Sequence, residues 1–257
     1  MRRYVAEAIG TFGVVLTGCG AMLVGGARLG DAGIALAFGA ALAAMLFATA
    51  PISGGHLNPA VTLAMAAAGR LRPRDIAPYL AAQIAGGVAA AGTVLAIAGG
   101  RPGGAPRAAE TIANGYGRLS PGFYGVASAL LAEVALTALF IFVFLSVSPR
   151  PSPPGQAGRG TETRPAILPL AAGTAYAVIH LVGLPVTRLS ANPARALGPA
   201  LLAGGPALEQ VWLFIAAPIL GGLLASLAHR YLRGPVSTGS PGDAPASSSA
   251  PQAPPAG

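Results

Sequence analysis

Charge is scarce in this sequence. Of its 257 residues, 9% are charged, against about 25% in soluble domains. Lysine is absent, and the 16 basic residues, all arginine, give a net charge of +8. The arginines lie between apolar stretches and form no basic face interleaved with aromatic residues. This pattern argues against a soluble enzyme and against a nucleic-acid-binding protein.

Cysteine and aromatic residues are also rare. The single cysteine, Cys19, cannot form an intramolecular disulfide, which excludes a disulfide scaffold. Aromatic residues make up 6% of the chain, so most of its 53% hydrophobic content is aliphatic. We interpret this composition as that of a polytopic membrane protein.

Apolar stretches recur at about the 20 residues needed to cross a bilayer. Six are long enough, at about 4–25, 32–50, 78–100, 123–147, 166–185 and 208–229. Two shorter segments, 52–68 and 188–203, carry Pro, Gly and Asn near their starts. We predict that each enters the membrane as a loop and returns as a half-helix, which requires burial in protein or a water-filled cavity.

The arginines predict the topology. Six crossings place both termini on one side, together with ten arginines: Arg2, Arg3, Arg70, Arg72, Arg74, Arg150, Arg159, Arg164, Arg230 and Arg233. The other side carries five: Arg28, Arg101, Arg107, Arg118 and Arg188. The positive-inside rule therefore predicts cytoplasmic termini. Composition further predicts a flexible cytoplasmic loop at 148–165 and a disordered tail at 234–257.

The chain contains an internal repeat. AEAIGTF, which includes Glu7 and Thr11, resembles AEVALTALF, which includes Glu133 and Thr137. Each half then has three spans and one half-helix, over about 1–100 and 123–233. An odd number of crossings turns the second half upside down, as in inverted-repeat channels and transporters. The predicted fold is all-α, with six transmembrane helices, two re-entrant half-helices and an inverted 3+3 repeat.

A carboxylate within a membrane span is costly, so Glu7 and Glu133 need an explanation. One interpretation is a proton relay. The other is a pair of structural buried carboxylates that accept hydrogen bonds from the backbone of the re-entrant loops. Their symmetric placement, one in each half, favours the structural interpretation.

Asn-Pro-Ala occurs twice, once in each short segment: Asn58, Pro59 and Ala60, then Asn192, Pro193 and Ala194. Proline suits the first helical position, and asparagine suits the N-cap while keeping an amide donor available. Two such helix starts facing each other would place two amides and two positive helix ends at one point. A small neutral molecule can bind there, whereas a cation is repelled.

These motifs resemble the aquaporin (major intrinsic protein) family, and are most similar to its bacterial water channels. The resemblance covers about residues 3–233 and rests on AEAIGTF, GIALAFG, ISGGHLNPAVT, ANGYGRLSPGFYG, IHLVGLPVT, ANPAR and PILGGLLASLAHR. It implies a channel domain over 1–233 and a homotetramer with one pore in each subunit.

The resemblance also implies site residues. The selectivity filter, called the filter below, maps to Phe38, His180, Leu189 and Arg195. A ladder of backbone carbonyls that water follows maps to Gly54, Gly55, His56, Ser190 and Ala191. Arg195 would offer fixed donors and a charge that opposes cations.

Within the family, a filter histidine favours water over glycerol, as does Ala196 directly after Arg195 where glycerol facilitators have Asp. Leu189 and Ile215 depart from the common water-channel pattern. The predicted function is a passive water channel that excludes ions and protons. A facilitator for glycerol or other small neutral solutes is the alternative.

Three further classes are less favoured: an ion-coupled secondary transporter, a non-conducting structural member of the family, and an enzyme. The sequence shows no nucleophile–base pair, metal cluster or phosphate loop, so we predict no catalytic residue, metal or cofactor. The expected partners are water, membrane lipid and further copies of the chain, and no nucleic acid. The expected location is the cell membrane of a bacterium, its inner membrane.

Overall fold

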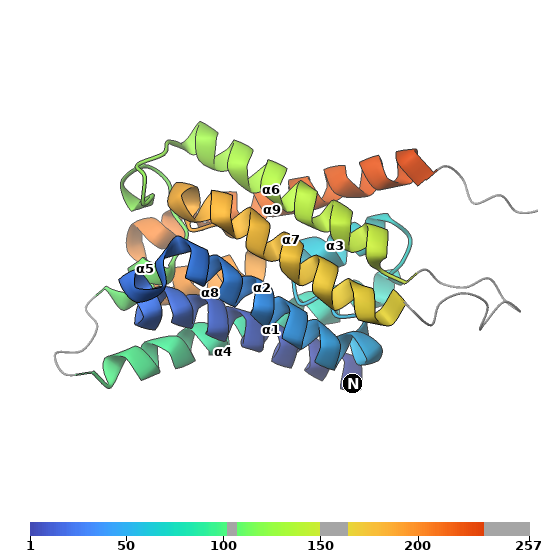
Figure 1. The fold of residues 1–257 in the computed structure, drawn as a ribbon, viewed down its shortest axis with the longest axis horizontal. Helices are drawn as coiled ribbons and strands as arrows, with labels where there is room; N and C mark the ends of the chain where they lie inside the picture. The colour runs from blue at the N-terminus through green and yellow to red at the C-terminus, as the bar shows by residue number, and fades with distance from the viewer. Residues whose placement is uncertain (102–106, 150–163, 234–257) are drawn as a thin grey trace, which may run out of the picture.

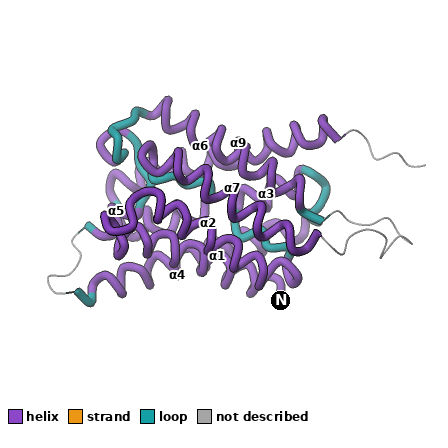
Figure 2. Tube along the Cα trace, viewed as in Figure 1, coloured by secondary structure: helices purple, strands orange, loops and turns teal. Residues whose placement is uncertain are grey.

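The computed structural model describes residues 1–101, 107–149 and 164–233, and all regular elements within these ranges are helical (Figures 1 and 2). The predicted tail 234–257 and most of the predicted loop 148–165 lie outside them. The long helices are α1 (Arg2–Gly20), α2 (Gly26–Ser53), α4 (Pro73–Gly99), α6 (Val126–Val147), α7 (Arg164–Thr187) and α9 (Gly205–Arg233). The shorter ones are α3 (Pro59–Ala67), α5 (Ala108–Ile112) and α8 (Pro193–Ala203).

The long helices agree with the predicted spans. Five helical stretches are long and apolar enough to cross a bilayer, and the first of them, Arg2–Ser53, contains both α1 and α2. A π-helical turn (Ala21–Gly25) joins these two helices, and the backbone leaves helical geometry at Gly30 (φ 60°, ψ 177°). Since α1 packs against α2, the chain reverses direction here. The short α5 and a 3₁₀ turn (Gly117–Leu119) were not predicted, because neither has enough residues for a periodic pattern.

Helix packing follows the internal repeat. In the first half α1 packs against α2 and α4, and in the second half α6 packs in the same way against α7 and α9. The two halves meet where α2 contacts α7. Each half-helix crosses over, since α3 packs against α9 and α8 against α4. The start of α1, the end of α6 and the end of α9 lie at one end of the bundle (Figure 1).

Glycines allow the closest helix contacts. A Cβ atom on Gly39 of α2 would lie 2.5 Å from the carbonyl oxygen of Gly173 on α7. A Cβ atom on Gly198 of α8 would lie 2.6 Å from the carbonyl oxygen of Gly87 on α4. Small residues at such crossings are typical of membrane helices, because association there depends on close packing more than on burial from water.

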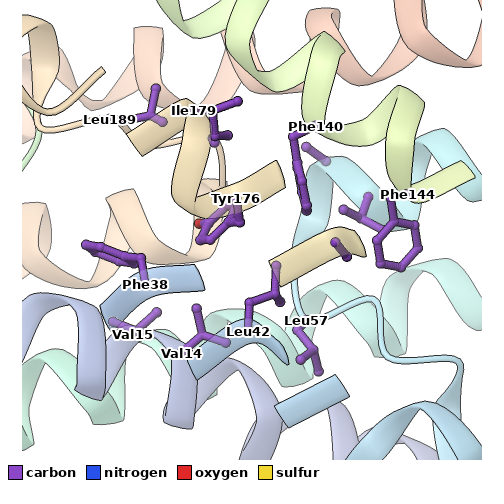
Figure 3. Packing of buried hydrophobic residues seen from close by; sticks show 14 of the residues in the cluster. Val14, Val15, Phe38, Leu42, Leu57, Phe140, Phe144, Tyr176, Ile179 and Leu189 are labelled. Carbon is purple, nitrogen blue, oxygen red and sulfur yellow. The ribbon is translucent and has the colours of Figure 1, made fainter. Parts of the chain in front are cut away.

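The apolar residues divide between an internal core and the outer face. Val14, Phe38, Leu42, Phe140 and Tyr176 pack together inside the bundle (Figure 3). Large aliphatic side chains on the long helices are exposed, including Leu131, Leu170, Val182 and Leu227. So much exposed apolar surface is unusual for a soluble monomer and suits a lipid environment. The chain is a multi-pass membrane protein.

Candidate functional site: two capped half-helices and a buried arginine

Both half-helices begin at Asn-Pro-Ala. The Asn58 side-chain oxygen accepts a hydrogen bond from the backbone N–H of Ala60 at 2.8 Å. The Asn192 side-chain oxygen accepts one from Ala194 at 3.0 Å and one from Arg195 at 3.4 Å. Proline occupies the first helical position in both cases, where a missing N–H costs nothing. The same local sequence therefore produces the same capped start twice.

The two caps bind each other's loops. The Asn58 amide nitrogen donates to the Ala191 carbonyl at 2.7 Å, and the Asn192 amide nitrogen donates to the Leu57 carbonyl at 3.0 Å. Both asparagines are buried. These reciprocal bonds join the starts of α3 and α8, so that the positive ends of two helix dipoles lie close together. Each amide group also has a second N–H.

Glu7 is surrounded by donors from the first re-entrant loop. Its carboxylate accepts from the backbone N–H groups of His56 at 3.0 Å and Leu57 at 2.6 Å. It also accepts from the Ser53 hydroxyl at 2.6 Å and the Gln83 amide at 2.7 Å. These four donors match the acceptor capacity of a carboxylate.

Glu133 has the equivalent position in the second half. It accepts from the backbone N–H groups of Ser190 at 2.8 Å and Ala191 at 3.0 Å, and from the Thr187 hydroxyl at 2.7 Å. Both carboxylates are fully buried. They therefore have the backbone partners that the structural interpretation expects, and their charge is met by fixed donors.

Both loops contain strained backbone. Leu57 has φ 53° in the first loop, while Leu189 and Ala191 have φ 29° and 46° in the second. Non-glycine residues rarely occupy this left-handed region, and they persist there only where the surroundings hold them. The bonds to Glu7 and Glu133 reach the N–H groups of Leu57 and Ala191 themselves. The carboxylates thus hold the backbone in the conformation that the predicted carbonyl ladder needs.

Arg195 is the largest fully buried side chain of the described residues. Its Nη1 donates to the Ile112 carbonyl at 2.9 Å and to the Asn114 side-chain oxygen at 2.8 Å. Its Nη2 donates to the Arg188 carbonyl at 3.2 Å and contacts the Met22 sulfur at 3.4 Å. Across the residues with described positions, its Nε has no hydrogen-bond partner. One donor of a fixed cation is therefore left for another molecule.

Two rings lie beside this arginine. The ring of His180 stacks on that of Phe38 with centroids 4.2 Å apart, and the Arg195 guanidinium carbon is 5.7 Å from the Phe38 centroid. His180 Nδ1 is 2.7 Å from the Tyr176 carbonyl, which can only accept, so Nδ1 carries the proton. In the neutral ring, His180 Nε2 is then an acceptor, and it is buried without a partner among the described residues. Among the described residues, Arg195 Nε is thus a donor without a partner, and His180 Nε2 is an acceptor without one.

The remaining predicted residues have less distinctive surroundings. Leu189 is buried, and a Cβ atom on Gly183 would meet its side chain at 2.6 Å, so the leucine packs closely against α7. His56 Nδ1 is 3.2 Å from the Thr62 hydroxyl oxygen, a contact that braces the first loop. His56 and Gly54 also line a cavity of about 400 Å³ at the end where α1 begins. The filter and ladder roles of these residues stay predictions.

Several residues of this region were not singled out from the sequence. Gln83 and Asn114 bind Glu7 and Arg195, and Met22 and Tyr176 lie against Arg195 and His180. They come from segments distant along the chain. Asn114 lies within the ANGYGRLSPGFYG motif, whereas no local pattern marks the other three. Among the residues that the structure describes, no group of three or more His, Cys, Asp or Glu side chains could hold a metal ion.

Relatives of this chain share its sequence over most of its length. A family model described as major intrinsic protein matches residues 1–229. Aquaporin Z from Rhodopseudomonas palustris is 43% identical over 234 residues, which cover 90% of this chain and 92% of the relative. Aquaporin Z from Bradyrhizobium diazoefficiens is 42% identical, with coverage of 90% and 93%. Aquaporin Z from Photorhabdus laumondii is 39% identical, with coverage of 90% and 97%.

A solved structure shares the fold. The aquaglyceroporin from Plasmodium falciparum superposes with a TM-score of 0.72, covering 88% of this chain and 93% of its own. At 21% identity this likeness concerns the fold alone. The paired half-helices, the internal repeat and the match over residues 1–229 lead to one conclusion: the chain belongs to the major intrinsic protein family.

Proposed function

We propose that this protein is a passive channel that conducts water across the membrane and excludes ions and protons. The observation that carries this proposal is the meeting of two Asn-capped half-helices, each bound to the other's loop. A pore past this point presents two amide donors and two positive helix ends. A water molecule accepts hydrogen bonds from the amides, while a cation meets a repulsive field.

The filter supplies the second step of selection. Arg195 Nε offers a donor and His180 Nε2 an acceptor, both buried and both without a partner among the described residues. A water molecule can bind to either group, because it both donates and accepts. Phe38 forms an apolar wall against both groups and keeps the passage narrow. Relatives named Aquaporin Z support water as the solute.

The carbonyl ladder guides the single file of water on either side of the asparagines. Gly54, Gly55 and His56 form it in one half, and Ser190 and Ala191 in the other. Gly54 and Gly55 have φ of 92° and 66°, which turns successive carbonyls away from helical directions. The cavity of about 400 Å³ beside Gly54 and His56 is the entrance on that side.

The carboxylates do not take part in transport. An ion-coupled transporter needs a free acidic group in its path, and Glu7 and Glu133 have their oxygens occupied by loop donors. A glycerol facilitator remains the second candidate, because Leu189 and Ile215 depart from the pattern usual in water channels. The proposal includes no enzymatic activity, catalytic residue, metal or cofactor.

The channel is a homotetramer with one pore in each subunit, in the inner membrane of a bacterium. Both termini are cytoplasmic. The start of α1 and the end of α9 lie at the same end of the bundle, as this topology requires (Figure 1). Arg3, Arg70 and Arg72 line the cavity at that end, in agreement with the positive-inside rule.

The function is tested with purified protein in liposomes by stopped-flow light scattering. Under a non-permeant osmotic step, we expect fast shrinkage with a low activation energy, and under a glycerol gradient no fast re-entry. Rapid glycerol re-entry would favour the facilitator instead. Shrinkage no faster than that of empty liposomes would refute a conducting channel.

We expect Leu189→Thr to raise water permeability about twofold, because threonine is smaller and adds a hydrogen-bond partner at the filter. Leu181→Thr is the matched control. Leu181 lies in α7, the helix that precedes the loop of Leu189, but it is 46% exposed. Permeability and glycerol exclusion are measured for both. If Leu189→Thr behaves as the wild type does, Leu189 has no part in the filter.

We expect mercurials to inhibit the channel by less than about twofold, because the only thiol is inaccessible. Cys19 is the sole cysteine of the sequence, and its exposed fraction is 0%. Water permeability is measured before and after HgCl₂, in the wild type and in Cys19→Ser. Strong inhibition that disappears in Cys19→Ser would contradict this prediction.

A further inference from the structure

The C-terminal end of α1 forms one wall of the filter. A Cβ atom on Gly18 would lie 2.0 Å from an edge atom of the Phe38 ring, so this glycine makes room for the ring. Four residues later, Met22 lies in the π-helical turn with its sulfur 3.4 Å from Arg195 Nη2. One short segment of the first half thus contacts two filter residues.

Met22 differs from the other partners of the Arg195 guanidinium. Two of them, the Ile112 carbonyl and the Asn114 side chain, come from the segment before α6. The third, the Arg188 carbonyl, comes directly after α7. Met22 is the partner that comes from the first half of the repeat. Its contact therefore links the arginine of the second half to α1, whose Gly18 touches the filter ring of α2.

The chemistry of the contact is directional. A thioether sulfur is a weak acceptor, and a guanidinium N–H that meets it gains a partner that an aliphatic side chain cannot provide. Met22 is 8% exposed, so its sulfur contacts the guanidinium in buried surroundings. Local π-helical geometry often occurs at functional sites. Here the turn at Ala21–Gly25 places the sulfur against the guanidinium.

We propose that Met22 is a positioning residue for Arg195: its sulfur holds Nη2, and this fixes the aperture at which water is separated from larger neutral polar solutes. The inference rests on the proposed water-channel function. Without the acceptor, the guanidinium loses one of its four contacts and moves more freely beside Phe38. The filter then admits solutes such as glycerol more readily, while water still passes.

The test compares two substitutions of opposite character. Met22→Leu keeps the apolar volume and removes the acceptor, whereas Met22→Gln keeps a side-chain acceptor of similar length and reduces apolar packing. For each variant, the glycerol-to-water permeability ratio is measured in proteoliposomes, because a ratio does not depend on how many channels are folded. We expect the ratio to rise about threefold in Met22→Leu, as for loss of one weak hydrogen bond, and to stay at the wild-type value in Met22→Gln.

If Met22 only fills space, the glycerol-to-water permeability ratio should equal the wild-type value in Met22→Leu and change in Met22→Gln. That result, or any other in which Met22→Leu keeps the wild-type ratio, would overturn the proposal. Met45→Leu is the matched control, since Met45 packs against Gly13 of α1 and should leave the ratio unchanged. If Met22→Leu does not fold, Met22→Ile carries the same test, because it also keeps apolar volume and removes the sulfur.

The outcome for Met22 can be separated from that for the channel itself. If the wild type conducts no water, the proposed function fails and the ratio has no meaning. If the wild type conducts water and Met22→Leu retains its ratio, only the role of Met22 is wrong.

Discussion

Arg195→Val is expected to raise glycerol permeability at least about tenfold and to open the pore to cations and protons. The substitution removes a fully buried guanidinium and, with it, the free Nε donor and the fixed positive charge of the filter. A smaller apolar side chain also widens the space beside Phe38. Because the proposed filter assigns both size and charge selection to this one side chain, the effect should exceed that of the other filter substitutions.

The measurement combines stopped-flow assays for water and glycerol with a proton-sensitive dye inside the liposomes. Arg118→Val is the matched control, because it removes an equal charge from an exposed position in the loop before α6. We expect this control to behave as the wild type does. A normal glycerol-to-water ratio and normal proton exclusion in Arg195→Val would show that Arg195 is not the filter residue.

Glu133→Gln is expected to destabilise the protein strongly, by about 3 kcal/mol or more. The Glu133 carboxylate accepts from two backbone N–H groups and one hydroxyl, all in a buried loop. A glutamine keeps one acceptor oxygen and places an NH₂ group opposite donors, which leaves at least one of them without a partner. The left-handed backbone at Leu189 and Ala191 then loses its support. Glu7→Gln is expected to act in the same way on the first loop.

Thermal unfolding in detergent and water permeability for each folded channel are both measured. Glu209→Gln is the control, since Glu209 is an exposed glutamate of α9. We expect a lower unfolding temperature for both buried variants and no change for the control. A variant of Glu7 or Glu133 with unaltered stability and altered proton coupling would instead support the relay interpretation.

The outline of the fold was predictable because it depends on local properties. Apolar length identifies a span, and Asn followed by Pro identifies a capped helix start. These features located the long helices, the half-helices α3 and α8, and the inverted order of the halves. The sequence did not predict how α1 is joined to α2. In the structure, a π-helical turn at Ala21–Gly25 and a break at Gly30 interrupt a nearly continuous helical stretch. Apolar periodicity carries no signal for such a turn.

The partners of the site residues were not predictable in the same way. Buried carboxylates could be paired with the loops by symmetry. Gln83 at Glu7, however, is an ordinary polar residue in the sequence, and the motif that contains Asn114 does not indicate Arg195 as its partner. Their contacts join segments separated by 76 and 81 positions. No spacing rule connects residues so far apart. The His180 proton position likewise follows from the Tyr176 carbonyl, which only the folded helix places at Nδ1.

From the sequence alone it follows that this protein spans a membrane, that its two halves are inverted copies, and that two Asn-Pro-Ala helix starts belong together. Those conclusions depend on composition, length and repetition, which are properties of a chain in any conformation. Which donors and acceptors beside Phe38 lack partners among the described residues follows only from the folded structure. That question concerns a balance of hydrogen bonds among residues from both halves, and such a balance exists only once they are packed against each other.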